Sequence, residues 1–315
     1  MQIIRDSDRG SGAPGPTALS IGVFDGVHRG HQHVLATLRR EARAHDLLTA
    51  VVTFDPHPAE VVRPESAPLL LTTLDQRLEL LADFGVDIVY VVQFDQARAH
   101  ETPEDFVQDV LVDTLKVRLV VIGEDFHFGH RRRGNVDLLR ELGERDGFEV
   151  AGLDLLPQDS GAEAISSTTI RRLLAGGEVE AAAEMLGRPY SLTGVVDHGD
   201  ERGRQIGFPT ANIPVSSRMA WPADGVYAGW YTRVDAGERY RCAINIGRRP
   251  TFYEDAAQSL LEAHLLDFDG DLYGERAQIE FVQFLRSEQR FDGIDALTAQ
   301  LKRDVERTRE LLSTD

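Results

Sequence analysis

A strand-like segment that runs through a glycine turn straight into a helix-like segment lies near the start of the chain. Residues 19–24 are apolar and suit a strand, Gly26 allows a tight turn, and apolar residues recur at helical spacing from Val34 onward. His28 therefore falls in the turn and His31 in the first turn of the helix. Unpaired backbone N–H groups and the helix dipole favour a bound phosphate at such a junction. Two imidazoles there can hydrogen-bond a phosphate chain and stabilise the charge on departing pyrophosphate.

Strand-like and helix-like segments alternate over the first half of the chain. We expect strands at 48–54, 88–94, 119–122 and 148–153 and helices at 75–84 and 136–145. Near-continuous apolar strands joined by helices predict a parallel α/β sheet covered on both faces, in the manner of a Rossmann-like domain. Ligands bind such sheets beyond the carboxyl ends of the strands. Residues 6–16 are rich in Ser, Gly, Pro and charge and are interpreted as a mobile surface segment.

The pattern changes after residues 188–190, where short alternating segments follow one another. We expect strands at 191–197, 225–232, 240–246, 260–268 and 276–285. This spacing predicts an antiparallel barrel or sandwich. A terminal helix over 294–312, with Ile294, Leu297, Leu301 and Val305 on one face, is expected to pack against it. The predicted domains are therefore 1–187 and 188–315.

Composition narrows the class of partner. The 315 residues include 52 acidic and 34 basic side chains, and a net charge of -18 opposes binding to nucleic acid. No apolar run approaches the roughly 20 residues of a membrane span, and the first residues lack the pattern of a signal peptide, so we expect a cytoplasmic protein that does not bind membranes. Cys242 is the only cysteine, which excludes an intramolecular disulfide and a cysteine-rich metal site.

Phosphate chemistry in this chain cannot depend on a lysine-bearing loop. Lys116 and Lys302 are the only lysines, neither lies in a glycine-rich loop, and no P-loop pattern is present. Arginine, backbone N–H groups and metal are left for that task. Residues 165–171, Ile-Ser-Ser-Thr-Thr-Ile-Arg, place hydroxyl groups ahead of a helix. Hydroxyls in this position cap helices, and the same exposed N–H groups bind phosphates, so both interpretations stay open.

Two further motifs lie in the second half. The glycines of residues 203–212, Gly-Arg-Gln-Ile-Gly-Phe-Pro-Thr-Ala-Asn, suit close approach to phosphates, and the oxygens of Thr210 and Asn212 suit Mg2+ bound together with ATP. A plain turn before a strand would explain the same stretch. In Leu-Glu-Ala-His-Leu, strand alternation puts Glu262 and His264 on one face.

The string Gly-Val-Phe-Asp-Gly-Val-His-Arg-Gly-His at 22–31 resembles the bacterial bifunctional riboflavin kinase/FAD synthetase family, and the motifs at 165–171 and 203–212 match the same family in the right order. The resemblance implies a kinase that converts riboflavin to FMN in the second domain and an FMN adenylyltransferase in the first, with ATP and Mg2+. It implies catalytic roles for His28, His31 and Arg171 in the first domain and a general base at Glu262. Riboflavin, FMN and FAD are then substrates and products.

Binding roles follow from the same resemblance. The residues implied in ATP or phosphate binding are Gly22, Phe24, Asp25, Gly30, Ser166, Ser167, Thr168, Gly203, Arg204, Gly207 and Pro209. Those implied in flavin binding are His57, Asp125, Phe126, Phe128 and Arg286, and Thr210 and Asn212 are implied in metal binding. Some relatives have asparagine at the position of Asp125, which could repel the FMN phosphate or bind metal. The basic run 130–133 is likewise unusual.

Other functions use parts of the same patterns. Class I aminoacyl-tRNA synthetases also contain His-x-Gly-His, but they carry a lysine-bearing phosphate loop and a basic RNA surface, and this chain has neither. A monofunctional riboflavin kinase with a non-catalytic first domain is disfavoured by intact His28, His31 and Arg171. A nucleotidylyltransferase for a pyridine mononucleotide or a phosphopantetheine compound would not need the 203–212 motif. The sequence leaves self-association open.

Overall fold

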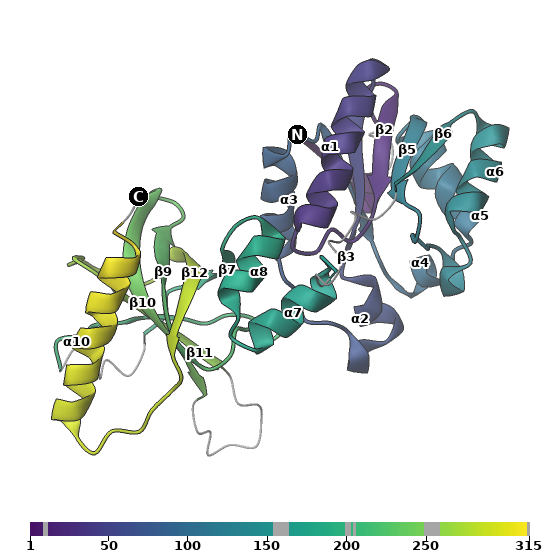
Figure 1. Ribbon diagram of the computed structural model, residues 1–315. Coiled ribbons are helices and arrows are strands. Elements are labelled where there is room, and N and C mark those ends of the chain that lie inside the picture. The colour runs from purple at the N-terminus through teal and green to yellow at the C-terminus, as the bar shows by residue number, and fades with distance from the viewer. Residues whose placement is uncertain (9–11, 154–163, 199–202, 204–205, 249–258, 314–315) are drawn as a thin grey trace. The chain divides into compact units, whose positions relative to one another are not determined.

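The computed structural model describes residues 1–8, 12–153, 164–198, 203, 206–248 and 259–313 (Figure 1). The chain forms two compact units, Met1–Ile165 and Ser166–Asp315, and each unit is built around one sheet. None of the helices in the described part of the chain has the length and apolar character of a membrane span.

The sheet of the first unit is parallel, with the strand order β1-β4-β3-β2-β5-β6. Its strands are β1 (Gln2–Arg5), β2 (Thr17–Ile21), β3 (Leu48–Asp55), β4 (Ile88–Gln93), β5 (Val117–Gly123) and β6 (Glu149–Leu153). The central strand β2 pairs with β3 on one side and β5 on the other, and all of its residues are buried. This confirms the predicted parallel sheet.

Helices cover both faces of this sheet (Figure 1). They are α1 (Arg29–Ala44), α2 (Pro58–Val62), α3 (Leu74–Asp83), α4 (Gln96–His100), α5 (Pro103–Phe106), its π-helical continuation η3 (Val107–Thr114) and α6 (Val136–Asp146), with short 3-10 turns η1 (Asp6–Asp8), η2 (Pro64–Ser66) and η4 (His130–Arg132). Leu35 and Leu38 of α1 share one core cluster with Leu78 and Leu81 of α3, while α5, η3 and α6 contribute to the cluster on the other face.

The structure of the first unit differs from two expectations and contains one strand that was not predicted. The strand predicted at 19–24 ends at Ile21, because Phe24 has a positive φ of 52° and already belongs to the turn. The edge strand β1 was not predicted. Residues 6–16 were expected to be mobile, and residues 9–11 of this segment lie outside the described residues. On either side of them the segment is held: the carboxylate of Asp6 accepts hydrogen bonds from the Tyr90 hydroxyl at 2.5 Å and from Arg98 Nη2 at 3.0 Å, and Ala13 is buried.

The second unit begins with α7 (Ser167–Ala175) and α8 (Val179–Leu186) and continues into an antiparallel sheet of order β7-β12-β9-β10-β11-β8. The strands are β7 (Tyr190–Val195), β8 (Ala211–Ile213), β9 (Gly225–Arg233), β10 (Glu238–Arg248), β11 (Ser259–Leu265) and β12 (Arg276–Arg286). A bridge between Asp197 and Asn212 joins the chain after β7 to β8, so the sheet curls toward a barrel. The predicted antiparallel architecture is confirmed; the short strand β8 was not predicted.

The terminal helix α10 (Ile294–Leu311) packs against β9 and β10. Its fully buried residues are Asp304 and Thr308, and Leu297 and Leu301 are half-buried on the same side. Ile294 was placed on the packing face, but it is 61% exposed, because the first turn of the helix, residues 294–296, is exposed throughout. The second compact unit starts at Ser166 and therefore includes α7 and α8. The functional boundary between 187 and 188 stays a prediction.

Candidate active sites and the family of the chain

The turn between β2 and α1 brings the two predicted histidines into contact. His28 is the N-cap residue of α1, and its Nδ1 accepts a hydrogen bond from the backbone N–H of His31 at 3.4 Å. The two imidazoles stack with ring centroids 3.7 Å apart, and the Phe24 ring lies 5.0 Å from that of His31. A Cβ on Gly30 would come within 3.1 Å of the His28 ring, so a larger residue there would press on the stacked pair. The predicted positions of His28 and His31 are confirmed.

Burial determines the protonation state of His31. Desolvation, followed by the charges of His28 and Arg77, holds the pKa of His31 well below its ordinary value of 6.5. A neutral imidazole at pH 7 follows. Its Nδ1 is buried and has no hydrogen-bond partner among the described residues. An unsatisfied buried nitrogen costs free energy that a hydrogen-bonding ligand would recover.

The buried carboxylate of Asp25 ties the turn to the segment ahead of α3. Its carboxylate accepts hydrogen bonds from the backbone N–H groups of Leu71 and Thr72, each at 3.0 Å. The Thr72 hydroxyl in turn accepts from the Gly26 N–H at 3.1 Å. These contacts hold the turn in an unfavourable conformation, since β-branched Val27 has a φ of 39°. The predicted contact of Asp25 with ATP stays a prediction.

One buried arginine in this region was not found from the sequence. Arg77 of α3 is 1% exposed and lies close enough to the histidine pair for its charge to lower the pKa of His31. The available signal was a charged residue on an apolar helix face, because Leu74, Leu78 and Leu81 share helical spacing with Arg77.

The predicted flavin-binding residues of the first unit follow the strands on either side of β2. His57 comes directly after β3 and caps α2, its Nδ1 accepting from the Ala59 N–H at 3.0 Å. Asp125 and Phe126 follow β5 and are exposed and half-buried, respectively. Phe128 is only 6% exposed and belongs to the core cluster. Because parallel neighbours end at the same edge, these loops flank the histidine turn.

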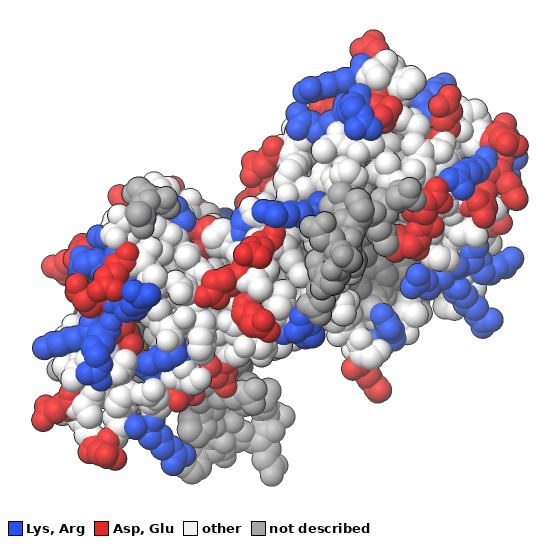
Figure 2. Space-filling view, in the orientation of Figure 1, with Lys and Arg blue, Asp and Glu red and all other residues white. Residues whose placement is uncertain are grey.

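The basic run after this loop is exposed. Arg131, Arg132 and Arg133 are exposed, and basic side chains gather over the region of α4 in the space-filling view (Figure 2).

The hydroxyl motif at 166–171 begins the second unit. Ser166 caps α7 by accepting from the Thr169 N–H at 3.1 Å, and Ser167, Thr168 and Arg171 belong to the same helix. Their joint use with the histidine pair stays a prediction.

Three adjacent strands of the second unit carry a polar row. Glu262 of β11 lies opposite Asn212 of β8 on one side and opposite Asn245 of β10 on the other. The alternate residues Leu261 and Ala263 are fully buried, which confirms that Glu262 is on the polar face of its strand. His264 shares this face.

The segment before β8 is held against this row. His264 Nδ1 makes a hydrogen bond of 2.8 Å with the Pro209 carbonyl, next to Thr210. A Cβ on Gly203 would lie 2.2 Å from the Phe208 carbonyl oxygen, so the backbone packs more closely there than any other residue allows. Gly207 has a positive φ of 83°. Arg204 lies outside the described residues.

Asn212 offers an oxygen ligand in this site. The residue is 8% exposed, and its Oδ1 is buried with no hydrogen-bond partner among the described residues. An unpaired buried amide oxygen beside a carboxylate fits a hard cation such as Mg2+, which takes oxygen ligands.

Arg286, predicted to bind flavin, is held by α10. Its guanidinium makes an ion pair of 2.7 Å with the carboxylate of Asp304, which is 5% exposed, and its carbon lies 5.8 Å from the centre of the Phe291 ring. Gln300 donates to the same carboxylate at 2.8 Å. The ion pair fixes the guanidinium, and direct contact of Arg286 with flavin stays a prediction.

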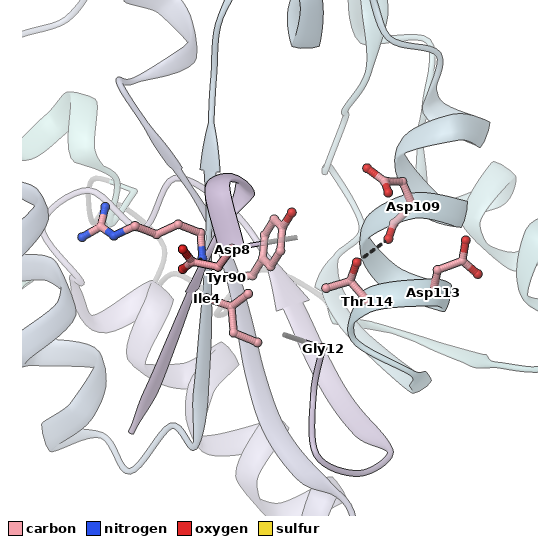
Figure 3. A pocket seen from close by; sticks show the side chains of 8 residues that line it. Ile4, Asp8, Gly12, Tyr90, Asp109, Asp113 and Thr114 are labelled. Carbon is pink, nitrogen blue, oxygen red and sulfur yellow. Dashed lines mark hydrogen bonds between the residues drawn. The ribbon is translucent and has the colours of Figure 1, made fainter. Parts of the chain in front are cut away.

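A separate cavity of about 250 Å³ lies between the first residues of the chain and η3 (Figure 3). It is lined by Ile4, Arg5, Asp8, Gly12, Tyr90, Asp109, Asp113 and Thr114. The Thr114 hydroxyl, at the end of η3, donates a hydrogen bond to the carbonyl of Asp109 at 2.8 Å. No predicted site residue lines this cavity, so we assign it no part in the reactions considered below.

Comparison with known proteins assigns a family to each half of the chain. The FAD synthetase family model matches residues 11–169 and the Riboflavin kinase family model matches residues 186–312. The chain is 41% identical over 312 residues to a bifunctional riboflavin kinase/FMN adenylyltransferase of Escherichia coli, covering 98% of this chain and 97% of that one. A protein of the same description from Listeria monocytogenes is 43% identical over 293 residues, covering 92% and 91% of the two chains.

A solved structure covers both units as well. It is described as a macrolide-efflux protein from Streptococcus pneumoniae, with a TM-score of 0.88 and 31% identity, and it covers 98% of this chain and 99% of that one. The two family models confirm the resemblance drawn from the motifs. The chain therefore belongs to the family of bifunctional riboflavin kinase/FMN adenylyltransferases.

Proposed function

We propose that the chain makes FAD from riboflavin in two steps. Residues 188–315 transfer the γ-phosphoryl group of ATP to riboflavin and give FMN. Residues 1–187 transfer the adenylyl group of a second ATP to FMN and release pyrophosphate. Matches to both family models support this function over a monofunctional kinase. We place the reaction in the cytoplasm, where ATP is available to both steps.

The observation that carries the adenylyl-transfer step is the stacked pair of His28 and His31 at the start of α1. A phosphate oxygen of FMN attacks the α-phosphorus of ATP, and the bond to the bridging oxygen of the leaving pyrophosphate breaks. Because the FMN phosphate is already an anion at pH 7, no strong base is needed. The imidazoles and the backbone N–H groups of α1 stabilise the departing pyrophosphate by hydrogen bonds.

We assign the remaining phosphate contacts of this step to other residues of the motifs at 22–31 and 165–171. Gly22, Phe24, Asp25 and Gly30 shape the turn, and Ser166, Ser167, Thr168 and Arg171 add hydroxyl groups and a positive charge. Positioning and charge neutralisation of this kind account for most of the rate in phosphate transfers.

In the kinase step, Glu262 is the general base. Its carboxylate accepts the proton of the riboflavin 5′-hydroxyl while that oxygen attacks the γ-phosphorus and ADP leaves. The position of Glu262 beside Asn212 in the β8–β11 pairing supports this role. Gly203, Arg204, Gly207 and Pro209 hold the ATP phosphates.

Thr210 and Asn212 would hold Mg2+ in the kinase step. The unpaired buried Oδ1 of Asn212 supports this assignment. When bound, the ion neutralises charge on the ATP phosphates.

For the flavin, we propose contacts with His57, Asp125, Phe126 and Phe128 in the first domain and with Arg286 in the second.

The test of the first site is adenylylation of supplied FMN. His28→Ala should lower the rate of FAD formation by about 100-fold or more, while the matched variant His33→Ala, on an exposed position of the same helix, should retain it. Both variants should phosphorylate riboflavin normally. Full FAD formation by His28→Ala would overturn the assignment of this site.

A further inference from the structure

Arg77 is among the largest side chains that are fully buried in the described part of the chain, and the mechanism above does not use it. The residue lies on α3, on the same face as Leu78 and Leu81. Burial of a guanidinium is costly unless the group is paired and hydrogen-bonded. The contacts of Arg77 therefore indicate what the buried charge is used for.

The guanidinium connects α3 to the ends of the two central strands. Arg77 Nη1 donates to the Thr53 hydroxyl and to the Phe54 carbonyl, each at 3.0 Å. The Thr53 hydroxyl donates onward to the carbonyl of Val23 at 2.9 Å. Val23 begins the turn that carries the histidine pair. A single side chain thus links α3, the end of β3 and the start of that turn.

The opposite side of the turn is fixed just ahead of α3. Asp25 accepts from the backbone N–H groups of Leu71 and Thr72, and Gly26 donates to the Thr72 hydroxyl. Asp25 also acts on Arg77 through its charge. The strained turn is therefore held by hydrogen bonds from two places: the backbone and hydroxyl groups just ahead of α3, and Arg77 on α3, acting through Thr53.

The charge of Arg77 reaches the proposed phosphate site. It acts directly on His31, and its Nε is buried without a hydrogen-bond partner among the described residues. Burial lowers the pKa of Arg77, whereas Asp25 and Asp55 raise it. An arginine stays protonated under these conditions, so a fixed positive charge lies close enough to His31 to act on it.

We propose that Arg77 is a positioning residue for adenylyl transfer: its guanidinium fixes the β2–α1 turn in the conformation that stacks His28 on His31, and its charge favours departure of pyrophosphate. The inference rests on the proposed role of the histidine pair. In this proposal Arg77 acts through the turn and through the electric field, rather than by contact with FMN or ATP.

The experiment compares three single variants of the protein, and His28→Ala is measured beside them as a reference. Arg77→Met removes the charge and the hydrogen bonds, Arg77→Lys keeps the charge without the forked donor, and Leu81→Ala disturbs the same buried face of α3 without changing any charge. Each protein is assayed for adenylylation of FMN and for phosphorylation of riboflavin, and its thermal melting is recorded. The kinase step is an internal reference for active protein.

We expect Arg77→Met to lower kcat for FMN adenylylation by about 100-fold and Arg77→Lys by about tenfold, with kinase turnover unchanged. Leu81→Ala should lower the melting temperature but keep adenylylation kcat within about twofold of the parent. If Arg77→Met loses no more activity than Leu81→Ala, Arg77 is only a structural residue. If His28→Ala retains activity, the proposed role of the turn itself fails, whatever the result at Arg77.

The pH profile separates positioning from mere stability. The groups that act electrostatically on His31 are His28, at the start of the same helix, and Arg77 from α3, with Asp25 and Asp55 facing Arg77. Loss of the Arg77 charge should raise the pKa of His31. The acid limb of adenylylation kcat is assigned to protonation of His31, so it should move to higher pH in Arg77→Met and stay in place in Arg77→Lys. Acid limbs that coincide in both variants would overturn the electrostatic part of the proposal.

Discussion

His31 shows how burial changes the chemistry of a single residue. The folded protein keeps this imidazole neutral, since desolvation and the charges of His28 and Arg77 hold its pKa well below 6.5. In the unfolded chain the group protonates as the pH falls through about 6.5. The unfolded state then binds the additional proton, and the folded state becomes less stable.

His31→Gln should therefore make the protein less sensitive to acid. Between pH 7.5 and 5.5 the parent should lose stability through this group by at most about 1.4 kcal/mol for each pH unit below the unfolded-state pKa. The variant should lose less over the same range. Urea unfolding of the first domain at several pH values measures the difference, with exposed His33→Gln as the control. Equal slopes for the parent and His31→Gln would show that His31 is not held neutral.

Asn212 is the residue at which the metal assignment can be tested. Removal of its Oδ1 in Asn212→Ala should raise the Mg2+ concentration needed for half-maximal kinase activity by at least about tenfold, because a ligand oxygen is lost. Adenylylation of supplied FMN should be unaffected. An unchanged Mg2+ dependence of the kinase step would remove Asn212 from the metal site.

At the scale of elements, α10 is fastened to the barrel by one buried ion pair. Asp304 accepts from Arg286 and Gln300 and is 5% exposed, so its loss would leave a largely covered guanidinium without its carboxylate partner. Asp304→Ala should destabilise the second domain by about 3–5 kcal/mol. Arg307→Ala, which breaks an exposed pair with Glu310 on the same helix, should change stability by less than about 1 kcal/mol. Chemical denaturation that gives similar losses for both variants would contradict this account of the helix.

The long elements were predictable, whereas short elements and buried charges were not. The strands β3 and β4 and helix α6 have strong apolar periodicity, and their predicted ranges agree with the structure to within one residue at each end. The edge strand β1 and the three-residue strand β8 are too short for a periodic signal, and tertiary pairing determines them.

The candidate sites divide in the same way. The positions of His28, His31 and Glu262 were predictable because local motifs carry them, and strand alternation or helix capping places them as expected, while their chemical roles stay predictions. Arg77 was missed because its contacts are with β3 and, through Thr53, with the turn after β2, which are remote in sequence from α3. Ile294 was assigned to a packing face but is exposed, because local periodicity cannot show at which turn of a helix the packing begins.

At the scale of the whole molecule, the only cysteine reports on the integrity of the barrel. Cys242 is fully buried in β10, and burial raises the pKa of its thiol far above the ordinary value. Thiol reagents should therefore leave the native protein unmodified at pH 8 and label it in urea, because the thiolate is the reactive form. Rapid labelling of the native protein at the rate of a free thiol would show that the barrel opens readily.

The central claim is that one chain holds two separable reactions. The most direct measurement is flavin chromatography after incubation of riboflavin, ATP and Mg2+ with His28→Ala, with Glu262→Gln, and with an equal mixture of the two variants. We predict that His28→Ala accumulates FMN, that Glu262→Gln leaves riboflavin unchanged, and that the mixture forms FAD, because FMN released by one variant is adenylylated by the other. FAD formation by either variant alone, or none in a mixture that has accumulated FMN, would contradict the account.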